Sequence, residues 1–458
     1  MRKIERRAAL CLLIALALVA GLGLFCFRYA TQASVWASYP FNRHMYSNSG
    51  QLLSGTITDR DGDVLSEVKD GTRTFYPDAT VRKATLHAVG DPQGNIGTGA
   101  LTAFADQLSG YNLITGGYSP LGSRHTLALT IDAGLNVTAY KALDGRQGTV
   151  GVYNYKTGDI LCMVSTPSFD PMNPPSVSDT QSEAFNGVYL NRFLSSAQVP
   201  GSIFKTVTLS AALENIADLK SRSFRCTGET EVGGSIITCP KPHGKMDIQS
   251  AFANSCNGVF AQLAAEMGGE TMTHYVEKAG LTSRMSISGI QTAAGKYDVS
   301  KADKGQLGWS GVGQYTDTVN PANMMTFMGA IANEGTAAVP RLIASVTSRD
   351  TGLPSSWTST KQTDTLIEPE TASTVKAMLK NNVVQTYGQE RFRELDVGAK
   401  SGTAEVGGGK RPNAWFTGFL DDPAHPYAFI VLVENGGGGA SVAGEIAATV
   451  LRACVDKY

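Results

Sequence analysis

The stretch Val199-Pro200-Gly201-Ser202-Ile203-Phe204-Lys205-Thr206 decides how the rest of the chain is interpreted. Ser202 and Lys205 stand three residues apart at the predicted start of a helix, and side chains at this spacing share one helix face. A serine hydroxyl needs a nearby base to become a nucleophile. Lysine can be that base when burial or a neighbouring cation lowers its pKa. The stretch therefore predicts a serine nucleophile with a lysine base, at a helix N-terminus whose N–H groups suit a developing oxyanion.

The Ser-x-x-Lys pattern is weak by itself, because it recurs at Ser66 and at Ser373. Two further motifs strengthen it. Ser255-Cys256-Asn257 and Lys400-Ser401-Gly402-Thr403 follow the predicted nucleophile, in the order and of the type found in penicillin-binding proteins and class A β-lactamases. Lys156-Thr157-Gly158 also matches the last motif, but it precedes Ser202 and reads as a turn between two strands.

With these motifs the chain resembles the class B penicillin-binding proteins, which are peptidoglycan D,D-transpeptidases of the penicilloyl-serine transferase superfamily. The resemblance is clear from Gly148 onward and begins at the Gly-x-Ile-x-Asp-Arg segment of residues 55–60. It implies that Ser202 attacks the penultimate D-Ala carbonyl of a peptidoglycan stem peptide and that β-lactams acylate the same serine.

The resemblance also implies roles for the other motif residues. Lys205 is the general base, Ser255 a proton shuttle, and Asn257 an amide that contacts the substrate backbone and orients Lys205. The remaining roles belong to one strand. Lys400 places positive charge near the substrate carboxylate, and Ser401 keeps a hydroxyl where the usual motif has Thr. Gly402 leaves room for substrate bound as an added β-strand, and Thr403 donates a hydrogen bond through its hydroxyl. The N–H groups of Ser202 and Thr403 form the oxyanion hole. No cofactor is implied, and no metal ligand is placed in the catalytic site.

Two other activities stay open on the same motifs. A β-lactam hydrolase or a D,D-carboxypeptidase would resolve the acyl-enzyme with water, and a non-catalytic receptor or scaffold would bind β-lactam without turnover. Cys256 stands where class A β-lactamases have Asp, which favours a transpeptidase.

The predicted fold is α+β, with an antiparallel sheet covered by helices. A hairpin of residues 148–154 and 159–165 joins strands near 397–406, 414–420 and 427–434, and helices are expected over 248–267, 321–333 and 442–454. Residues 29–145 are expected to form a smaller, mixed, non-catalytic domain, and residues 146–458 the transpeptidase domain.

The N-terminus predicts a membrane anchor in residues 1–28. Basic residues precede an uncharged run of 20 residues, Ala8 to Phe27, which is long enough to cross a bilayer. The basic flank places the N-terminus in the cytoplasm and the catalytic domain outside the membrane. The resemblance adds a membrane glycan polymerase as partner. With 39 basic and 40 acidic residues, the chain shows no basic footprint for nucleic acid.

Three of the seven cysteines lie near the predicted active-site motifs. An extracytoplasmic location permits a Cys226–Cys239 disulfide. Alternatively, Cys226, Cys239, His243 and Cys256 could form a four-ligand site, because three thiolates and an imidazole suit tetrahedral zinc. The sequence leaves this choice open.

Overall fold

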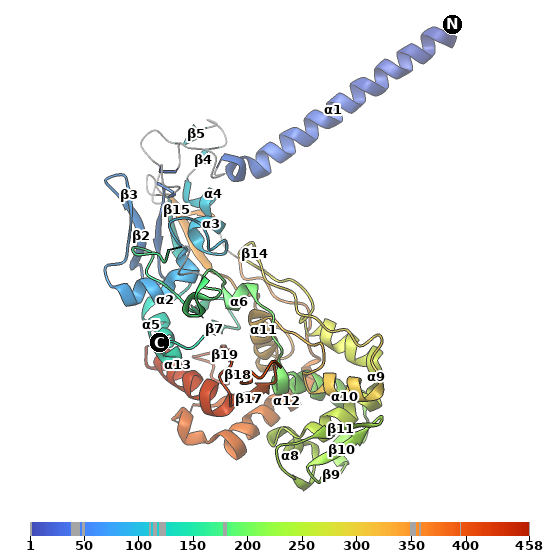
Figure 1. Cartoon of the computed structure of the whole chain (residues 1–458). Helices are drawn as coiled ribbons and strands as arrows, with labels where there is room; N and C mark the ends of the chain where they lie inside the picture. Colours follow the sequence, from blue (N-terminus) through green and yellow to red (C-terminus); the bar gives the residue numbers. More distant parts are fainter. Residues whose placement is uncertain are drawn as a thin grey trace.

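The computed structural model describes residues 2–37, 46–47, 51–109, 111–112, 117–118, 125–176, 181–348, 354–356, 359–393 and 395–457. Parts of the predicted non-catalytic domain of residues 29–145 lie outside these residues. Figure 1 shows the whole chain, with α1 at one end and the helices around α9 at the other.

A five-stranded antiparallel sheet forms the centre of the C-terminal two thirds of the chain. Its order is β17-β18-β19-β7-β8, so β17 is an edge strand beside the nucleophile's turn. The strands are β7 Gly148–Asn154, β8 Ile160–Thr166, β17 Val397–Ala404, β18 Asn413–Leu420 and β19 Tyr427–Val433. The α+β prediction is confirmed, and the Lys156-Thr157-Gly158 segment is the turn between β7 and β8.

Both faces of this sheet are buried, which explains why β19 reads as a continuous apolar run and why every residue of β18 is buried. Alternate residues of a strand point to opposite faces: Trp415 and Phe419 belong to one core, and Ala414 and Phe416 to the other. Helix α11, Pro321–Ala332, covers the first face. Helices α5, Ala133–Leu143, and α13, Gly444–Lys457, cover the second.

The predicted helix over 248–267 is wrong in one respect. The structure has two helices there, α8 Ile248–Ala253 and α9 Asn257–Lys278, because the chain turns at residues 254–256. Ser255 adopts φ 54°, a left-handed conformation that a continuous right-handed helix does not contain. The break places the Ser255-Cys256-Asn257 motif on the turn and at the start of α9.

A second, six-stranded sheet lies towards the N-terminal end. Its order is β16-β15-β6-β1-β2-β3, with β1 Thr56–Thr58, β2 Val64–Lys69, β3 Thr72–Phe75 and β6 His125–Leu129. Strands β15, Ile343–Ser348, and β16, Pro354–Ser356, come from much later in the chain. The N-terminal sheet is therefore completed by residues from the region predicted to be catalytic, and the boundary at 145/146 stays a prediction.

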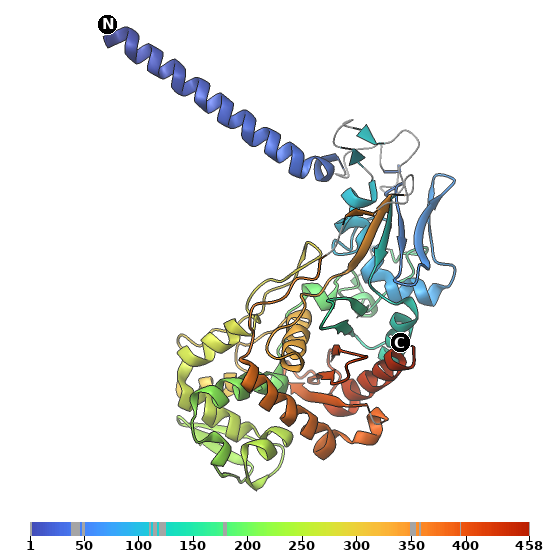
Figure 2. The ribbon, with the colours of Figure 1, turned by 180° about the vertical axis from the view of Figure 1, so that it is seen from behind.

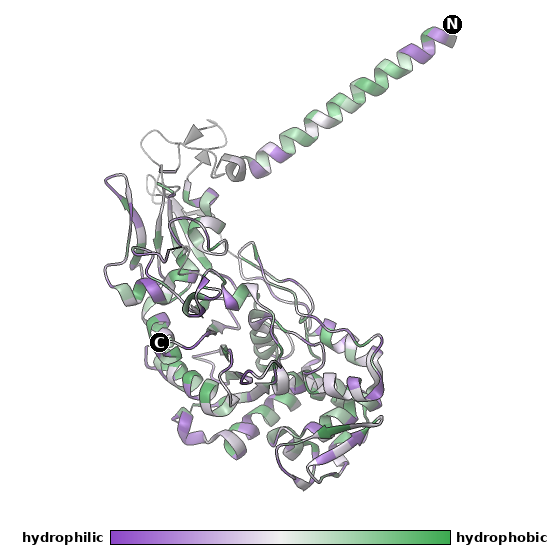
Figure 3. Cartoon of the chain, in the orientation of Figure 1, coloured by the Kyte–Doolittle hydropathy of each residue, from purple (hydrophilic) through white to green (hydrophobic). Residues whose placement is uncertain are grey.

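The first helix, α1, Arg2–Ala37, is longer than the predicted anchor. Figures 1 and 2 show it projecting from the end that carries the N-terminal sheet, and Figure 3 shows its middle as apolar. In the described part of the chain, one helix is long and apolar enough to cross a membrane, over Lys3–Ala33.

The remaining elements are short or lie around the site. The other helices are α2 Ala79–Val89, α3 Ala100–Ala103, α4 Ala105–Ser109, α6 Arg192–Ser195, α7 Lys205–Asn215, α10 Lys304–Gly311 and α12 Pro369–Asn382. The other strands are β4 Tyr111–Asn112, β5 Gly117–Tyr118, β9 Phe224–Cys226, β10 Glu229–Val232, β11 Ser235–Thr238, β12 Gly244–Met246, β13 Ser286–Ile287 and β14 Ile290–Gln291.

Candidate active site

Ser202 lies on a 3₁₀ turn, Gly201–Phe204, that leads directly into α7. Gly201 has φ +55°, and its N–H donates to Gly313 O at 2.9 Å. A Cβ on Gly201 would come within 3.0 Å of Ala404 on β17. The glycine therefore allows both the left-handed entry and the close approach of the nucleophile's turn to the edge strand.

Lys205 is fully buried, and its amine lies between four oxygen atoms. Nζ is 2.9 Å from Ser202 Oγ, 2.6 Å from Asn257 Oδ1, 2.7 Å from Ser255 O and 3.1 Å from Ser255 Oγ. Asn257 is held in turn, because its Nδ2 donates to Thr238 O at 2.8 Å. The structure thus brings together the four residues that the sequence predicts as catalytic.

Ser255 links the two buried lysines of the site. Lys400 Nζ lies 3.0 Å from Ser255 Oγ and 3.2 Å from Ser401 O. Because Lys205 and Lys400 both contact the Ser255 hydroxyl, it lies on a continuous path of polar groups from Ser202 to β17. In the described part of the chain, no carboxylate is hydrogen-bonded to this path.

The electrostatics favour a neutral amine at Lys205. Burial lowers its pKa well below the ordinary lysine value, and the positive charge of Lys400 lowers it further. Burial lowers the pKa of Lys400 to about 7. Burying an ammonium group without a hydrogen-bonded carboxylate is costly, which is why burial lowers the pKa of both lysines.

Strand β17 carries the other predicted site residues on two faces. Gly402 faces the nucleophile's turn, where a Cβ would meet Pro200 O at 2.9 Å and Ile203 Cγ2 at 3.0 Å. The protein itself therefore requires a small residue here, in addition to the predicted need for substrate space. Thr403 is exposed, and its Oγ1 accepts from Gly439 N at 3.3 Å.

Tyr387 also lies at the site, although no sequence motif predicts it there. Its buried hydroxyl lies 3.1 Å from Ser401 Oγ and accepts from Ser401 N at 2.9 Å. The residue lies in a π-helical turn, Val383–Tyr387, after α12, and no motif or periodicity marks it. Only the fold brings it to β17.

Cys226 and Cys239, which the sequence allows either to form a disulfide or to join a metal site, are free thiols in the structure. Cys226, Cys239, His243 and Cys256 lie together beside the start of α9.

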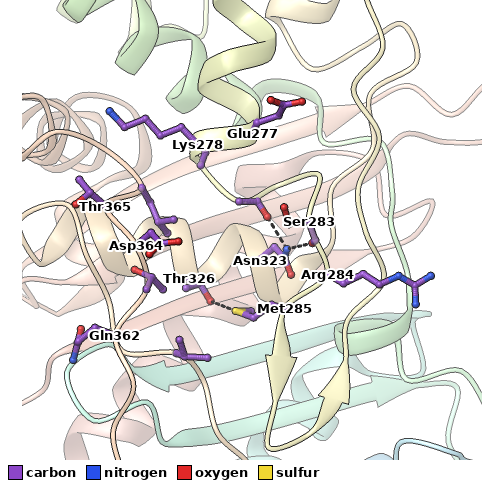
Figure 4. Close-up of a pocket in the computed structure, with 15 residues that line it drawn as sticks. Glu277, Lys278, Ser283, Arg284, Met285, Asn323, Thr326, Gln362, Asp364 and Thr365 are labelled. Carbon is purple, nitrogen blue, oxygen red and sulfur yellow. Dashed lines mark hydrogen bonds between the residues drawn. The ribbon is translucent and has the colours of Figure 1, made fainter. Parts of the chain in front are cut away.

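A separate pocket of about 550 Å³ lies between the end of α9, α11 and residues 362–366. Figure 4 shows Asn323 among its lining residues, where Nδ2 donates to Gly280 O and Ser283 O at 2.8 Å each. None of the predicted site residues lines it.

Comparison with known proteins agrees with this geometry. The model of the penicillin binding protein transpeptidase domain matches residues 148–452. The chain is 29% identical over 329 residues to the peptidoglycan D,D-transpeptidase PbpA of Mycolicibacterium smegmatis, covering 68% of this chain and 66% of that protein. It is 30% identical over 359 residues to stage V sporulation protein D of Bacillus subtilis, covering 73% of this chain and 53% of that protein. The matched part thus spans between about half and two thirds of these relatives.

Solved structures cover more of the chain. The D,D-transpeptidase domain of a peptidoglycan glycosyltransferase from Eggerthella lenta has a TM-score of 0.77 at 25% identity, covering 88% of this chain and 98% of that one. Penicillin-binding protein A from M. tuberculosis, solved as an imipenem acyl-enzyme complex, has a TM-score of 0.74 at 25% identity, covering 88% and 98%.

Proposed function

Because the chain belongs to the penicillin-binding protein transpeptidase family, we propose that it is a peptidoglycan D,D-transpeptidase that works through an acyl-enzyme on Ser202. One observation carries the proposal: a fully buried lysine amine lies 2.9 Å from the hydroxyl of a half-buried serine. Few structural roles explain a buried lysine whose contacts are serine and asparagine oxygens, whereas a general base requires this geometry.

The contacts of Lys205 define its role in acylation. A neutral amine has two N–H bonds, and Asn257 Oδ1 and Ser255 O can only accept hydrogen bonds. These two acceptors leave the lone pair of the amine directed at Ser202 Oγ. Lys205 takes the hydroxyl proton as Oγ attacks the penultimate D-Ala carbonyl of the stem peptide. The N–H groups of Ser202 and Thr403 stabilise the oxyanion.

Ser255 completes the proton path. As the tetrahedral intermediate collapses, the C–N bond to the terminal D-Ala breaks, and its nitrogen takes a proton from Ser255, which Lys205 replenishes. An amine of a neighbouring stem then attacks the ester and loses its proton to the same path. The ester C–O bond breaks, Ser202 Oγ regains its proton, and the cross-link is complete. A β-lactam also forms an ester with Ser202 Oγ, as the C–N bond of its ring breaks and the ring nitrogen takes the proton.

The edge strand β17 positions the substrate. It has strand β18 on one side only, so extended substrate can pair with its other edge near Thr403. Lys400 supplies positive charge near the substrate carboxylate and also helps to keep Lys205 neutral. The transpeptidase is favoured over a β-lactam hydrolase because no carboxylate in the described residues is hydrogen-bonded to Ser202 or its partners.

The helix α1 serves as a single membrane anchor. Arg2, Lys3, Arg6 and Arg7 precede its apolar part, which places the N-terminus in the cytoplasm and the transpeptidase domain outside. A membrane glycan polymerase supplies the strands that the enzyme cross-links. Protease added to intact cells should then digest residues after the anchor, and protection of those residues would contradict this orientation.

The test of the catalytic proposal is intact-mass spectrometry of the full-length protein after brief exposure to penicillin, followed over hours. We expect one stable adduct on Ser202, and none in Ser202→Ala at unchanged circular dichroism. Ser373→Ala is the matched control, because Ser373 heads another Ser-x-x-Lys pair and is exposed. A transient adduct with antibiotic turnover would indicate a hydrolase, and no adduct on the unaltered protein would indicate a scaffold.

The second activity test distinguishes the transpeptidase from a carboxypeptidase. A stem pentapeptide is incubated with and without an amine acceptor, and products are identified by mass. A cross-linked product is expected. Release of D-Ala to water alone, whatever the acceptor concentration, would contradict the proposal.

A further inference from the structure

Three thiols and one imidazole converge beside the active site from segments that are separated in sequence. Cys226, Cys239, His243 and Cys256 each offer one ligand atom, and these four atoms lie within 4.8 Å of one another. None of them touches Ser202 or has a role in the proposed reaction. We propose that these four side chains bind one zinc ion, which holds the turn of the Ser255-Cys256-Asn257 motif in place.

The local fold brings the ligands together in three steps. Strands β9 and β12 pair with Cys226 opposite Gly244, which places Cys226 beside His243. Cys239 follows β11, and its N–H donates to Gly228 O at 2.8 Å, which turns it back towards Cys226. The amide of Asn257 donates to Thr238 O, which brings Cys256 to Cys239. The long sequence spacings are thereby closed by pairs of short strands.

The distances suit a tetrahedral zinc ion. With Zn–S bonds of about 2.3 Å, two thiolates of a tetrahedral site are about 3.8 Å apart. Cys239 Sγ and Cys256 Sγ are 3.8 Å apart. The Sγ atoms of a disulfide are much closer, at about 2.05 Å. Three soft sulfur ligands with one imidazole favour zinc over magnesium or calcium.

The histidine provides a separate indication. Its Nδ1 is buried and has no hydrogen-bond partner in the described part of the chain. Buried polar atoms of native proteins nearly always have a partner. Ligation of a metal through Nδ1 would satisfy this atom. A disulfide would leave it without a partner and would also leave one of the three thiols unpaired.

The proposed zinc site adjoins the active site, because one of its ligands lies between two residues that contact Lys205. Cys256 lies between Ser255 and Asn257, both of which contact Lys205 Nζ. Ser255 is held at φ 54°, a conformation that needs support from its surroundings. Figure 1 shows that β9 to β11 form a small region at the end of the molecule around α8. Zinc would fix this region to α9, and with it the geometry of the lysine's partners.

The first experiment measures metal in the full-length protein, purified without chelator and without a histidine tag. We expect about one zinc per chain, with loss in Cys226→Ala and His243→Ala. Cys454→Ala and His274→Ala are the matched controls, because Cys454 is a buried thiol on α13 and His274 an exposed imidazole on α9. Zinc at or below the level of the Cys226→Ala variant in the unaltered protein would overturn the proposal.

A second measurement needs no variant. The protein is stripped with a chelator and titrated with Co²⁺, which should give the absorption of a tetrahedral thiolate complex that zinc then displaces. Absence of this spectrum would overturn the proposal, as would a non-reduced mass lower by two hydrogens, which signifies a disulfide.

The coupling is tested by the rate of β-lactam acylation, and this part rests on the proposed function. Metal removal should slow acylation by about tenfold, and zinc should restore it. An unchanged rate would overturn the positioning role while leaving zinc binding intact. Failure of the unaltered, metal-loaded protein to acylate would contradict the transpeptidase instead.

Discussion

At the scale of single residues, the site depends on which of two buried lysines carries charge. In the proposed reaction Lys205 must be neutral to accept the proton of Ser202, and burial together with the charge of Lys400 lowers its pKa, which favours this form. We therefore expect acylation to rise with pH through the lowered pKa of Lys205 and then to reach a plateau. Lys205→Gln should lower the acylation rate by about 10²–10⁴-fold, measured by stopped-flow with a chromogenic β-lactam. A rate within a few fold of the unaltered protein would contradict the assignment of the base.

Lys400 should influence the titration of Lys205. Its positive charge lowers the pKa of Lys205, so Lys400→Met should raise that pKa and move the rise in acylation to higher pH. The midpoint of the pH profile is the informative quantity, because the substitution also removes a proposed substrate contact and so lowers the rate at every pH. An unshifted midpoint would mean that the two amines do not interact.

At this scale the sequence predicts the chemistry of the site but not the contacts that support it. Ser202, Lys205, Ser255, Asn257 and Lys400 each belong to a short motif, and the structure brings all five together. Tyr387 belongs to no motif, because its contact with Ser401 depends only on where α12 ends relative to β17. Such a contact between distant segments leaves no periodic pattern in the sequence.

The hydroxyl of Tyr387 is expected to stabilise β17. Tyr387→Phe would leave the N–H of Ser401 without its acceptor, at a cost of about 1–3 kcal/mol for a buried group. Urea unfolding of the full-length protein measures this loss, with Tyr140→Phe on α5 as the matched control. Equal midpoints for the two variants would show that the contact contributes nothing to stability.

At the scale of elements, the close approach of β17 to the nucleophile's turn is the critical packing. Gly402→Ala would push Pro200 O and Ile203 away and so separate Ser202 from the strand that carries Thr403. Since small misplacements of reacting groups can reduce rates by about 10²-fold, acylation should fall strongly. Gly97→Ala is the control, because a Cβ there meets nothing within 4 Å. Equal acylation rates in the two variants would contradict this account.

Most strands and helices near the site were predictable, because their apolar residues follow strand or helix periods. The break between α8 and α9 was not. Residues 248–267 carry a helical pattern on both sides of the turn, and nothing in Ser255-Cys256-Asn257 forbids a helix. The left-handed Ser255 contacts Lys205 and Lys400, which are distant in sequence, so no local pattern marks the turn.

At the scale of the whole molecule, the two sheets are not built from separate stretches of the sequence. Strand β15 pairs with β6 across more than 200 residues of chain, with Val346 opposite Leu127. Pairing between such distant segments could not be read from local patterns, which is why the prediction placed all of residues 146–458 in one domain. The N-terminal sheet thus shares strands with the chain that forms the active site.

His87 lies at the contact between these two parts and should make it sensitive to acid. The imidazole, on α2, is fully buried with Nε2 2.9 Å from Val188 O, and burial, with a smaller contribution from Arg192, lowers its pKa to about 4. An unfolded histidine titrates near 6.5, so protons bind the unfolded state more strongly. The stabilisation is therefore complete above pH 6.5 and is lost as pH falls towards 4, by on the order of 3 kcal/mol in total.

Thermal unfolding of the full-length protein in detergent between pH 7 and pH 5 tests this expectation. His87→Gln keeps a donor for Val188 O but cannot titrate, so its unfolding temperature should fall less steeply over this range. His274→Gln, which replaces an exposed imidazole, should follow the unaltered protein. Parallel curves for all three proteins would show that other groups dominate the acid response. A shallower curve for His87→Gln alone would mean that acid weakens the contact between the N-terminal sheet and the transpeptidase region before the carboxylates titrate.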